Sequence, residues 1–141
     1  MRVIFTGSRR WTGIGYEFRA HEVLASLQGF VMTVGQTLEI VHGDCPEGLD
    51  AIVDRWALRR DYEPERHPAE WGVYGKLAGP IRNQEMVDLG ADMCLGFPLS
   101  DSKGTVDCMR RAKLAGILTI AVPWELTDEP EQLLPQQLKA A

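Results

Sequence analysis

Three short segments of the chain combine glycine with hydroxyl or charged side chains, each just after an apolar run. They are TGSRRW (residues 6–11), HGDCPEG (residues 42–48) and FPLSDSKGT (residues 97–105). Glycine lets the main chain approach an anion closely, and hydroxyl groups and cations bind anionic oxygens. A single segment of this kind is more often only a connection between elements. Three of them at the same edge of one fold would instead indicate a phosphate-binding pocket.

Apolar patterns between these segments predict alternating strands and helices. Short apolar runs predict buried strands at RVIF (2–5), LEIV (38–41), ADMCLGFPL (91–99) and ILTIAVP (117–123). Helical spacing follows the first two strands, in the sets Ala20, Val23, Leu24, Leu27, Val31 and Leu49, Ile52, Val53, Trp56, Ala57. Strands that are apolar throughout and alternate with helices are typical of a parallel sheet covered on both faces. The pattern therefore predicts an open, mainly parallel sheet in a three-layer α/β fold.

The remaining segments predict the edges and helix ends of this fold. DYEPERHP (61–68) is polar and contains Pro64, so any strand there should lie at a sheet edge. Residues 68–80 predict a loop that leads into a short helix with Pro80 in its first turn. Ser102 is expected to cap a further helix that ends at Gly116.

Length and composition predict one compact domain at residues 1–124, followed by an acidic tail or short helix at 125–141. The net charge is -5. Of 20 acidic and 15 basic residues, four and one lie in the tail, so residues 1–124 carry 16 acids and 14 bases. This near-neutral domain argues against nucleic acid as a partner. The chain shows no signal-peptide or membrane-span pattern, which predicts a cytoplasmic protein.

The cysteines and histidines indicate neither a disulfide framework nor a structural metal site. Cys45, Cys94 and Cys108 are odd in number and lack CxxC spacing, and only Cys45 falls in a loop. No metal-ligand spacing links the histidines to them, so we expect no cofactor metal. Magnesium could still accompany a phosphate ligand through Asp44 or Asp50.

Four quoted motifs, in order along the chain, resemble one protein family. TGSRRWT, VHGDCPEGLDAIVDRWA, WGVYGKLAGPIRNQEMV and SKGTVDCMRRAKLAGI resemble the YspA-type, cpYpsA-related branch of the SLOG superfamily. That superfamily also contains the Lonely Guy phosphoribohydrolases and the DNA-processing protein DprA. The resemblance implies a Rossmann-like domain, a nucleotide or nucleotide-derived ligand such as a nucleoside phosphate or ADP-ribose, and a homo-oligomer.

The family motifs and the loop composition together predict the ligand-binding residues. They are Thr6, Gly7, Ser8, Arg9, Trp11, His42, Gly43, Asp44, Gly48, Arg82, Asn83, Lys103, Gly104 and Thr105. Several of these have alternative roles. Trp11 could cover a base or roof the sheet, His42 could contact ligand or be a hydrogen-bonded structural residue, and Arg82 could clamp phosphate or form a surface salt bridge.

The candidate catalytic residues are Asp107 and Asp50. Lonely Guy enzymes carry a PGGxGTxxE signature, whereas this chain has LSDSKGTVDC, which keeps Gly104 and Thr105 but places Asp107 one residue earlier than the glutamate. A shorter carboxylate at a shifted position need not reach the same atom, and misplacement by about 1 Å can cost about 100-fold in rate. We therefore prefer a nucleotide binder, used as a sensor or sequestering module. The alternative is a hydrolase that cleaves the N-glycosidic bond of a nucleotide, with the carboxylate of Asp44, Asp50 or Asp107 stabilising charge or activating water.

The resemblance to DprA raises single-stranded DNA as a third ligand class. That mode of binding needs a positively charged groove and aromatic platforms for several bases. The near-neutral domain and the acidic tail argue against this mode, although Trp11, Trp71 and Tyr74 could stack one base. The number of basic and aromatic residues therefore favours a small nucleotide over a nucleic acid strand as the ligand.

Overall fold

Five parallel strands form one open sheet in the order β3-β2-β1-β4-β5. The computed structural model describes residues 1–124, and the predicted acidic tail at 125–141 lies outside the described residues. The strands are β1 (Arg2–Gly7), β2 (Glu39–His42), β3 (Glu65–Arg66), β4 (Met93–Phe97) and β5 (Leu118–Ala121). The two-residue β3 lies at the sheet edge, as its proline-containing sequence predicts.

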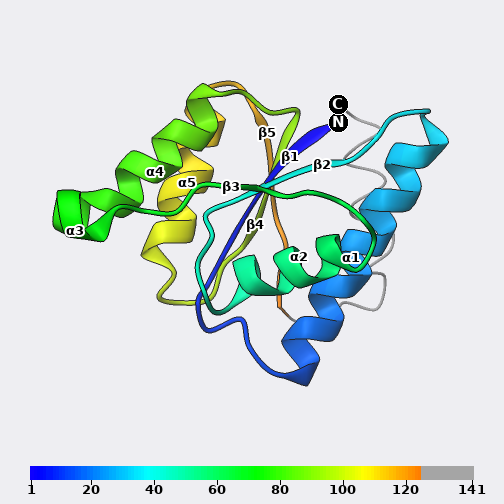
Figure 1. Ribbon diagram of the computed structural model, residues 1–141, viewed down its shortest axis with the longest axis horizontal. Helices are drawn as coiled ribbons and strands as arrows, with labels where there is room; N and C mark the ends of the chain where they lie inside the picture. Colours follow the sequence, from blue (N-terminus) through cyan, green and yellow to red (C-terminus); the bar gives the residue numbers. More distant parts are fainter. Residues whose placement is uncertain (125–141) are drawn as a thin grey trace.

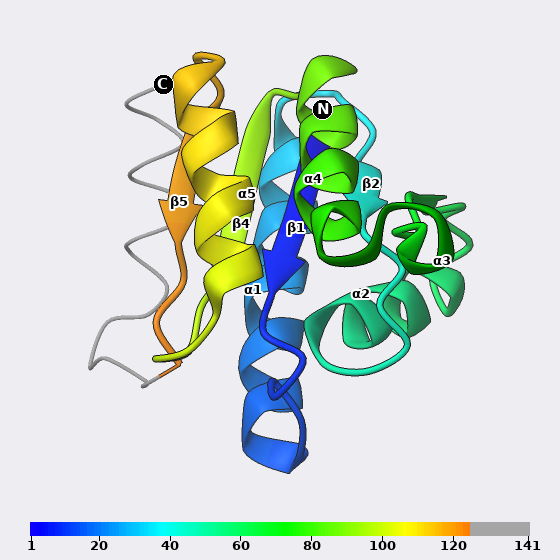
Figure 2. The same ribbon diagram turned by 90° about the vertical axis from the view of Figure 1, so that its left-hand side faces the viewer.

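Helices cover both faces of the sheet, so that the domain has three layers (Figure 1). The longer ones are α1 (Ile14–Thr33), α2 (Leu49–Leu58), α4 (Ala78–Asp88) and α5 (Lys103–Leu114). Helices α1 and α2 lie on one face, and α4 and α5 lie side by side on the other (Figures 1 and 2). The short α3 (Trp71–Tyr74) and the 3-10 turn η1 (Gly75–Leu77) lead into α4. The predicted α/β fold, with an open parallel sheet of Rossmann-like type, is confirmed.

The two faces of the sheet bury separate apolar clusters, because successive side chains of a strand point to opposite faces. Val3 and Phe5 of β1 pack with α1 and α2, whereas Ile4 between them packs with α4 and α5. This double burial explains why the strand sequences are apolar throughout. Within residues 1–124, no helix combines the length and the apolar character that crossing a membrane requires.

The ends of α5 differ in part from the expectation. Ser102 directly precedes the helix, but its side chain does not cap it, since the hydroxyl accepts a hydrogen bond from the Leu99 N–H at 2.8 Å. The cap prediction was therefore wrong about the side chain, which instead closes the preceding loop. At the other end, Gly116 has φ 79°, and the N–H groups of Gly116 and Ile117 donate to Lys113 and Ala112. These two bonds form a Schellman motif that ends the helix.

Candidate functional site

A single cleft of about 870 Å³ lies where the three glycine-containing loops follow the ends of β1, β2 and β4. Its fourth wall comes from the segment between β3 and α4. The sequence-predicted residues that line it are Thr6, Gly7, Ser8, Arg9, Gly43, Asp44, Asp50, Arg82, Asn83, Lys103, Gly104, Thr105 and Asp107. The carboxyl ends of parallel strands meet at one sheet edge, which is where such folds bind ligands.

The first loop is held in place by main-chain hydrogen bonds to two other elements. The Ser8 N–H donates to the Phe97 carbonyl at 3.1 Å, and the Ser8 carbonyl accepts from the Leu49 N–H at 3.2 Å. The Ser8 hydroxyl accepts from the Arg10 N–H at 3.0 Å. The loop is therefore anchored to β4 and α2, and it presents the exposed Arg9 at the cleft. Because Ser8 occupies the first amide of α2, that amide does not point at the cleft.

Gly48 and Trp11 do not line the cleft but shape its surroundings. Gly48 has φ 78°, and a Cβ there would lie 2.4 Å from the Ser8 carbonyl oxygen and 2.5 Å from the Arg9 Cα. Its role is thus to let the first two loops approach each other. Trp11 is fully buried, and its indole N–H donates to the Tyr16 carbonyl at 2.8 Å. Of the two predicted roles for Trp11, the structure supports the core residue over the sheet.

His42 is also a structural residue, with a side chain that is 1% exposed. Its Nδ1 accepts from the Asp44 N–H at 2.9 Å, so its proton is on Nε2, which lies 2.8 Å from the Asp54 carboxylate. Both ring nitrogens are therefore in use. The imidazole holds the second loop in place and does not line the cleft.

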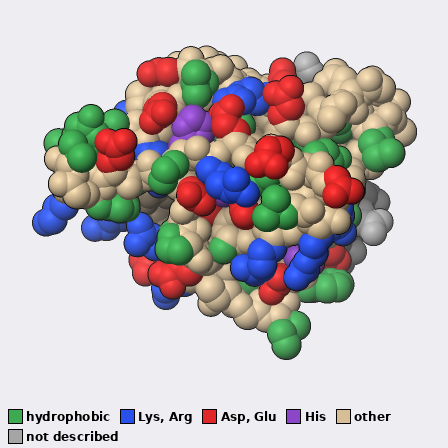
Figure 3. Space-filling view, in the orientation of Figure 1, with side chains coloured by type: hydrophobic (Ala, Val, Ile, Leu, Met, Phe, Trp, Pro, Cys, Tyr) green, Lys and Arg blue, Asp and Glu red, His purple; other side chains and the backbone are tan. Residues whose placement is uncertain are grey.

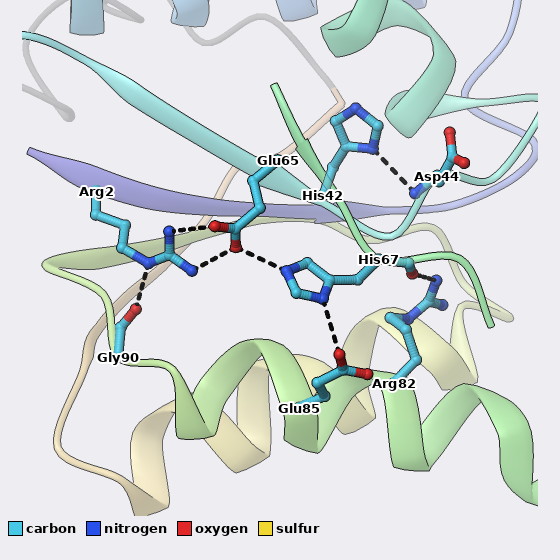
Figure 4. Close-up of polar contacts among 8 residues, drawn as sticks. All are labelled: Arg2, His42, Asp44, Glu65, His67, Arg82, Glu85 and Gly90. Atoms are coloured by element: carbon cyan, nitrogen blue, oxygen red, sulfur yellow. Dashed lines mark hydrogen bonds and ion pairs between the residues drawn. The ribbon is translucent and has the colours of Figure 1, made fainter. Parts of the chain in front are cut away.

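Arg82 joins the second loop to the segment after β3. Its guanidinium donates to the carbonyl of His67 at 3.2 Å (Figure 4). It also donates to the Gly43 carbonyl, and its Nε donates to Asn83 at 3.0 Å. The predicted surface salt bridge is thus not its role, since its partners are neutral. The planar fork of arginine suits this task because it can reach several acceptors at once.

Asn83 links α4 to α5 in the same way. Its side-chain N–H₂ donates to the Gly104 carbonyl at 3.2 Å and to the Asp107 carboxylate at 3.0 Å. Asp107 also accepts from Arg111 at 2.9 Å and from Arg110 at 3.1 Å. Burial alone would raise the pKa of Asp107, but the hydrogen bonds from Arg111 and Asn83 outweigh it and lower the pKa. Asp107 is therefore an ionised anchor for α5, a state that does not suit a general acid.

The carbonyl of His67, which Arg82 uses, belongs to a polar network across the sheet edge (Figure 4). The His67 ring lies between Glu65 at 2.7 Å and Glu85 at 3.3 Å. Glu65 also accepts from Arg2, and this hydrogen bond is the main reason why its pKa falls to about 2. The network links β1, β3 and α4 and thereby positions the wall that carries Arg82.

The start of α5 forms another wall of the cleft, next to α4. The amides of the first turn of a helix have no partners within the helix and carry a partial positive charge. In this protein that turn consists of the exposed Lys103 and Gly104 and the buried Thr105, all of which line the cleft. Asn83 fixes the turn through its bond to Gly104. The Lys103 amide donates to the Asp101 carbonyl at 2.9 Å, so the wall offers the amides of Gly104 and Thr105 together with the Lys103 ammonium group.

The cleft carries more positive charge than its carboxylates neutralise. Arg10 pairs with Asp101, and Asp107 is occupied by arginines of α5. Among the ion pairs within residues 1–124, none involves Arg9, Lys76 or Lys103, and all three line the cleft. Three cations around one hollow indicate an anionic ligand.

Two carboxylates of the cleft, those of Asp44 and Asp50, form no ion pair within residues 1–124, and of these two residues only Asp50 is buried. It is 7% exposed and accepts a hydrogen bond from the Cys45 N–H at 3.2 Å. Burial raises the pKa of Asp50, and the nearby His42 and the Cys45 amide offset this only in part.

Within the described residues, no group of three or more His, Cys, Asp and Glu side chains is placed to hold a metal ion. Asp44 and Asp50 both line the cleft, but Asp50 is occupied by an amide.

Comparison with known proteins now places this architecture in a family. A model of the YspA, cpYpsA-related SLOG family matches residues 1–74, more than half of the chain. The chain belongs to this family. It is also similar to the Gene 61 protein of Mycobacterium phage D29, with 44% identity over 126 residues that cover 84% of this chain and 94% of the relative. No solved structure matches the chain significantly. SLOG membership suggests a nucleotide-related function.

The sequence does not indicate that Trp71 and Lys76 of this SLOG protein line the same cleft. Both come from the α3 and η1 segment, which the sequence indicates only as a loop before a helix. The sequence predicts for Trp71 only a platform for a base of DNA, and it predicts no role for Lys76. The available signal was their position between Pro68 and Pro80, next to the motif that contains Arg82 and Asn83.

Proposed function

We propose that this SLOG protein binds a nucleotide or nucleotide-derived ligand in the cleft, as a sensor or sequestering module of the cytoplasm. The observation that carries the proposal is that Arg9, Lys76 and Lys103 surround one cleft without a carboxylate partner among residues 1–124. An anion on the ligand would supply the missing partner. The three free thiols, Cys45, Cys94 and Cys108, support a reducing compartment.

The start of α5 is the best candidate for the phosphate-binding part of the cleft. Phosphate at a helix N-terminus accepts hydrogen bonds from free amides and is favoured by the helix dipole. The Thr105 hydroxyl and the Lys103 ammonium lie at the same turn. Because Asn83 and Asp107 already fix this turn, little ordering remains to be done when the ligand binds.

The test replaces Lys103 with alanine and compares it with Lys113→Ala. Both lysines are exposed on α5, but only Lys103 lines the cleft. A hydrogen bond to a charged group contributes about 1.5–3 kcal/mol, so we expect Lys103→Ala to weaken binding about 10- to 150-fold. Isothermal titration calorimetry with AMP, ADP and ADP-ribose measures the effect.

The control variant should bind like the wild type. The free energy of unfolding should change by less than about 0.5 kcal/mol in both variants, since both positions are on the surface. The proposal fails if the wild-type protein binds none of the nucleotides. It also fails if both lysine variants weaken binding equally, because that would indicate only the overall charge.

A second candidate function, hydrolysis of an N-glycosidic bond, is favoured by one observation. Asp50 is a buried carboxyl with a raised pKa on the wall of the cleft. Such a group can act as a general acid and base. It would protonate the leaving base as the C1′–N bond breaks and take a proton from the water that forms the C1′–O bond. Asp107 is less suited because three donors hold it ionised.

The two functions are separated by incubation of the protein with AMP and chromatography of the products. Binding alone predicts no free adenine. Hydrolysis predicts free adenine and ribose 5-phosphate, with release lost in Asp50→Asn and kept at a reduced rate in Asp107→Asn. Release that survives in Asp50→Asn but not in Asp107→Asn would overturn the role of Asp50.

A further inference from the structure

Trp71 is an exposed aromatic residue that lines the cleft. Its side chain is 48% exposed, and neither α3 nor η1 contains a buried residue. These elements lie at one end of the molecule, beyond α4 (Figure 1), where the space-filling view shows hydrophobic side chains with Lys and Arg beside them (Figure 3). Trp71 therefore contributes little to the core, and packing in the core does not explain its position.

The indole is nevertheless held in a defined place. Its edge lies against α4 at Gly79, where a Cβ would be only 3.2 Å from the Trp71 ring. Gly79 is buried and lines the cleft together with Trp71. A larger residue at Gly79 would push the ring away from α4. Because Gly79 has no side chain, the edge of the indole can pack directly against α4.

The face of the same indole is covered by Arg9, from the first loop. The guanidinium carbon lies 5.5 Å from the ring centroid, which is a cation–π contact. Arg9 comes from the loop after β1 and Trp71 from the segment between β3 and α4, so their contact joins two walls of the cleft. Both groups are exposed or half-exposed, and Arg9 has no ion-pair partner among residues 1–124.

We propose that Trp71 is the platform on which the base of the bound ligand stacks, and that Arg9 leaves the indole to bind the ligand's phosphate. The inference rests on the proposed function and narrows its ligand to a nucleoside 5′-phosphate. Such a molecule carries an aromatic ring and an anion close together. Only that combination replaces both partners of the Arg9–Trp71 contact at once.

Replacing the Arg9–Trp71 contact by contacts to the ligand is expected to be favourable, because the new contacts are usually stronger than the one that is lost. An exposed cation–π contact corresponds to about 2- to 5-fold in affinity. Stacking of a base on an aromatic side chain corresponds to about 5- to 150-fold, and Arg9 gains a charge-assisted hydrogen bond to phosphate in addition. Lys76, five residues after Trp71, lines the same wall and can contact the same phosphate group. An inorganic phosphate or a sugar phosphate would draw Arg9 away without covering the indole.

The experiment compares AMP with ribose 5-phosphate, which lacks only the base, by calorimetry on Trp71→Ala, Trp71→Phe and Trp124→Ala. Trp124 is the matched control because it is 44% exposed but packs on Tyr16 outside the cleft. Trp71→Ala should weaken AMP binding about 5- to 150-fold and leave ribose 5-phosphate binding within 2-fold. Trp71→Phe should retain part of the AMP affinity, and Trp124→Ala should retain all of it.

The possible outcomes distinguish failure of the stacking role from failure of the proposed nucleotide-binding function. If the wild-type protein binds AMP and Trp71→Ala binds it equally well, the stacking role is wrong and the proposed function stands. If Trp71→Ala weakens AMP and ribose 5-phosphate equally, Trp71 shapes the cleft and does not bind a base. If the wild-type protein binds neither AMP nor ribose 5-phosphate, both proposals fail. The melting temperature should be unchanged in Trp71→Ala because the segment buries no residue.

Discussion

Gly48→Ala is expected to lower the free energy of unfolding by about 3–5 kcal/mol, because two separate costs act at this position. The backbone has φ 78° and ψ −149°, a conformation that residues with a Cβ rarely adopt. The new Cβ would also lie 2.4 Å from the Ser8 carbonyl oxygen, which is main chain and cannot rotate away. The first loop would have to separate from the start of α2. Urea unfolding followed by far-ultraviolet circular dichroism measures the loss.

Gly35→Ala separates the two costs. Gly35 also has a positive φ, 72°, but a Cβ there would meet nothing within 4 Å. Its substitution should therefore cost only the backbone strain, about 1–2 kcal/mol. Equal losses in the two variants would contradict the view that the first two loops are held in close contact through Gly48. A larger loss at Gly48, together with weaker nucleotide binding, would support it.

Arg82→Met is expected to abolish measurable ligand binding and to lower the free energy of unfolding by about 2–4 kcal/mol. The substitution keeps the length of the aliphatic stem but removes the donors to the Gly43 and His67 carbonyls and to Asn83. The second loop would then lose its link to α4, and Asn83 would lose the partner that orients its amide. The second loop depends on Arg82 directly and the start of α5 depends on it through Asn83, so we expect affinity for nucleotides to fall more than 100-fold in calorimetry.

Two further variants identify the cause of that effect. Arg82→Lys keeps the positive charge but cannot reach three acceptors in one plane, so it should recover little of the lost affinity. Arg59→Met removes an exposed arginine at the end of α2 and should change stability by less than about 0.5 kcal/mol. Full recovery of binding in Arg82→Lys would show that charge, and not the bridging of the two carbonyls, is what the cleft needs.

Much of the cleft could be predicted because the carboxyl ends of parallel strands share one edge. Once apolar runs indicate parallel strands, the segments after them must meet, and this placed Gly7, Gly43 and Gly104 near one another. The position of Pro80 in the first turn of α4 and the edge position of β3 follow from equally local rules on proline.

The roles of individual side chains could not be predicted in the same way. His42, Trp11 and Arg82 each had a ligand-binding and a structural interpretation, and their residue types alone do not distinguish the two. His42 is occupied by Asp54 and Asp44, and Arg82 by carbonyls 39 and 15 residues away in the chain. Such contacts depend on how loops and helices pack, and a single sequence holds no local signal for them.

The sequence by itself determined the order of strands and helices, the family resemblance and the edge of the sheet at which the loops meet, because these follow from local apolar patterns and from glycine and proline positions. The tertiary structure alone decided which polar groups are already occupied and which remain available to a ligand. Asn83 and Asp107 satisfy each other across α4 and α5, whereas Arg9, Lys76 and Lys103 line the cleft without a carboxylate partner within residues 1–124. That difference arises from packing between segments distant in the chain, and it is the physical basis for the proposed nucleotide site.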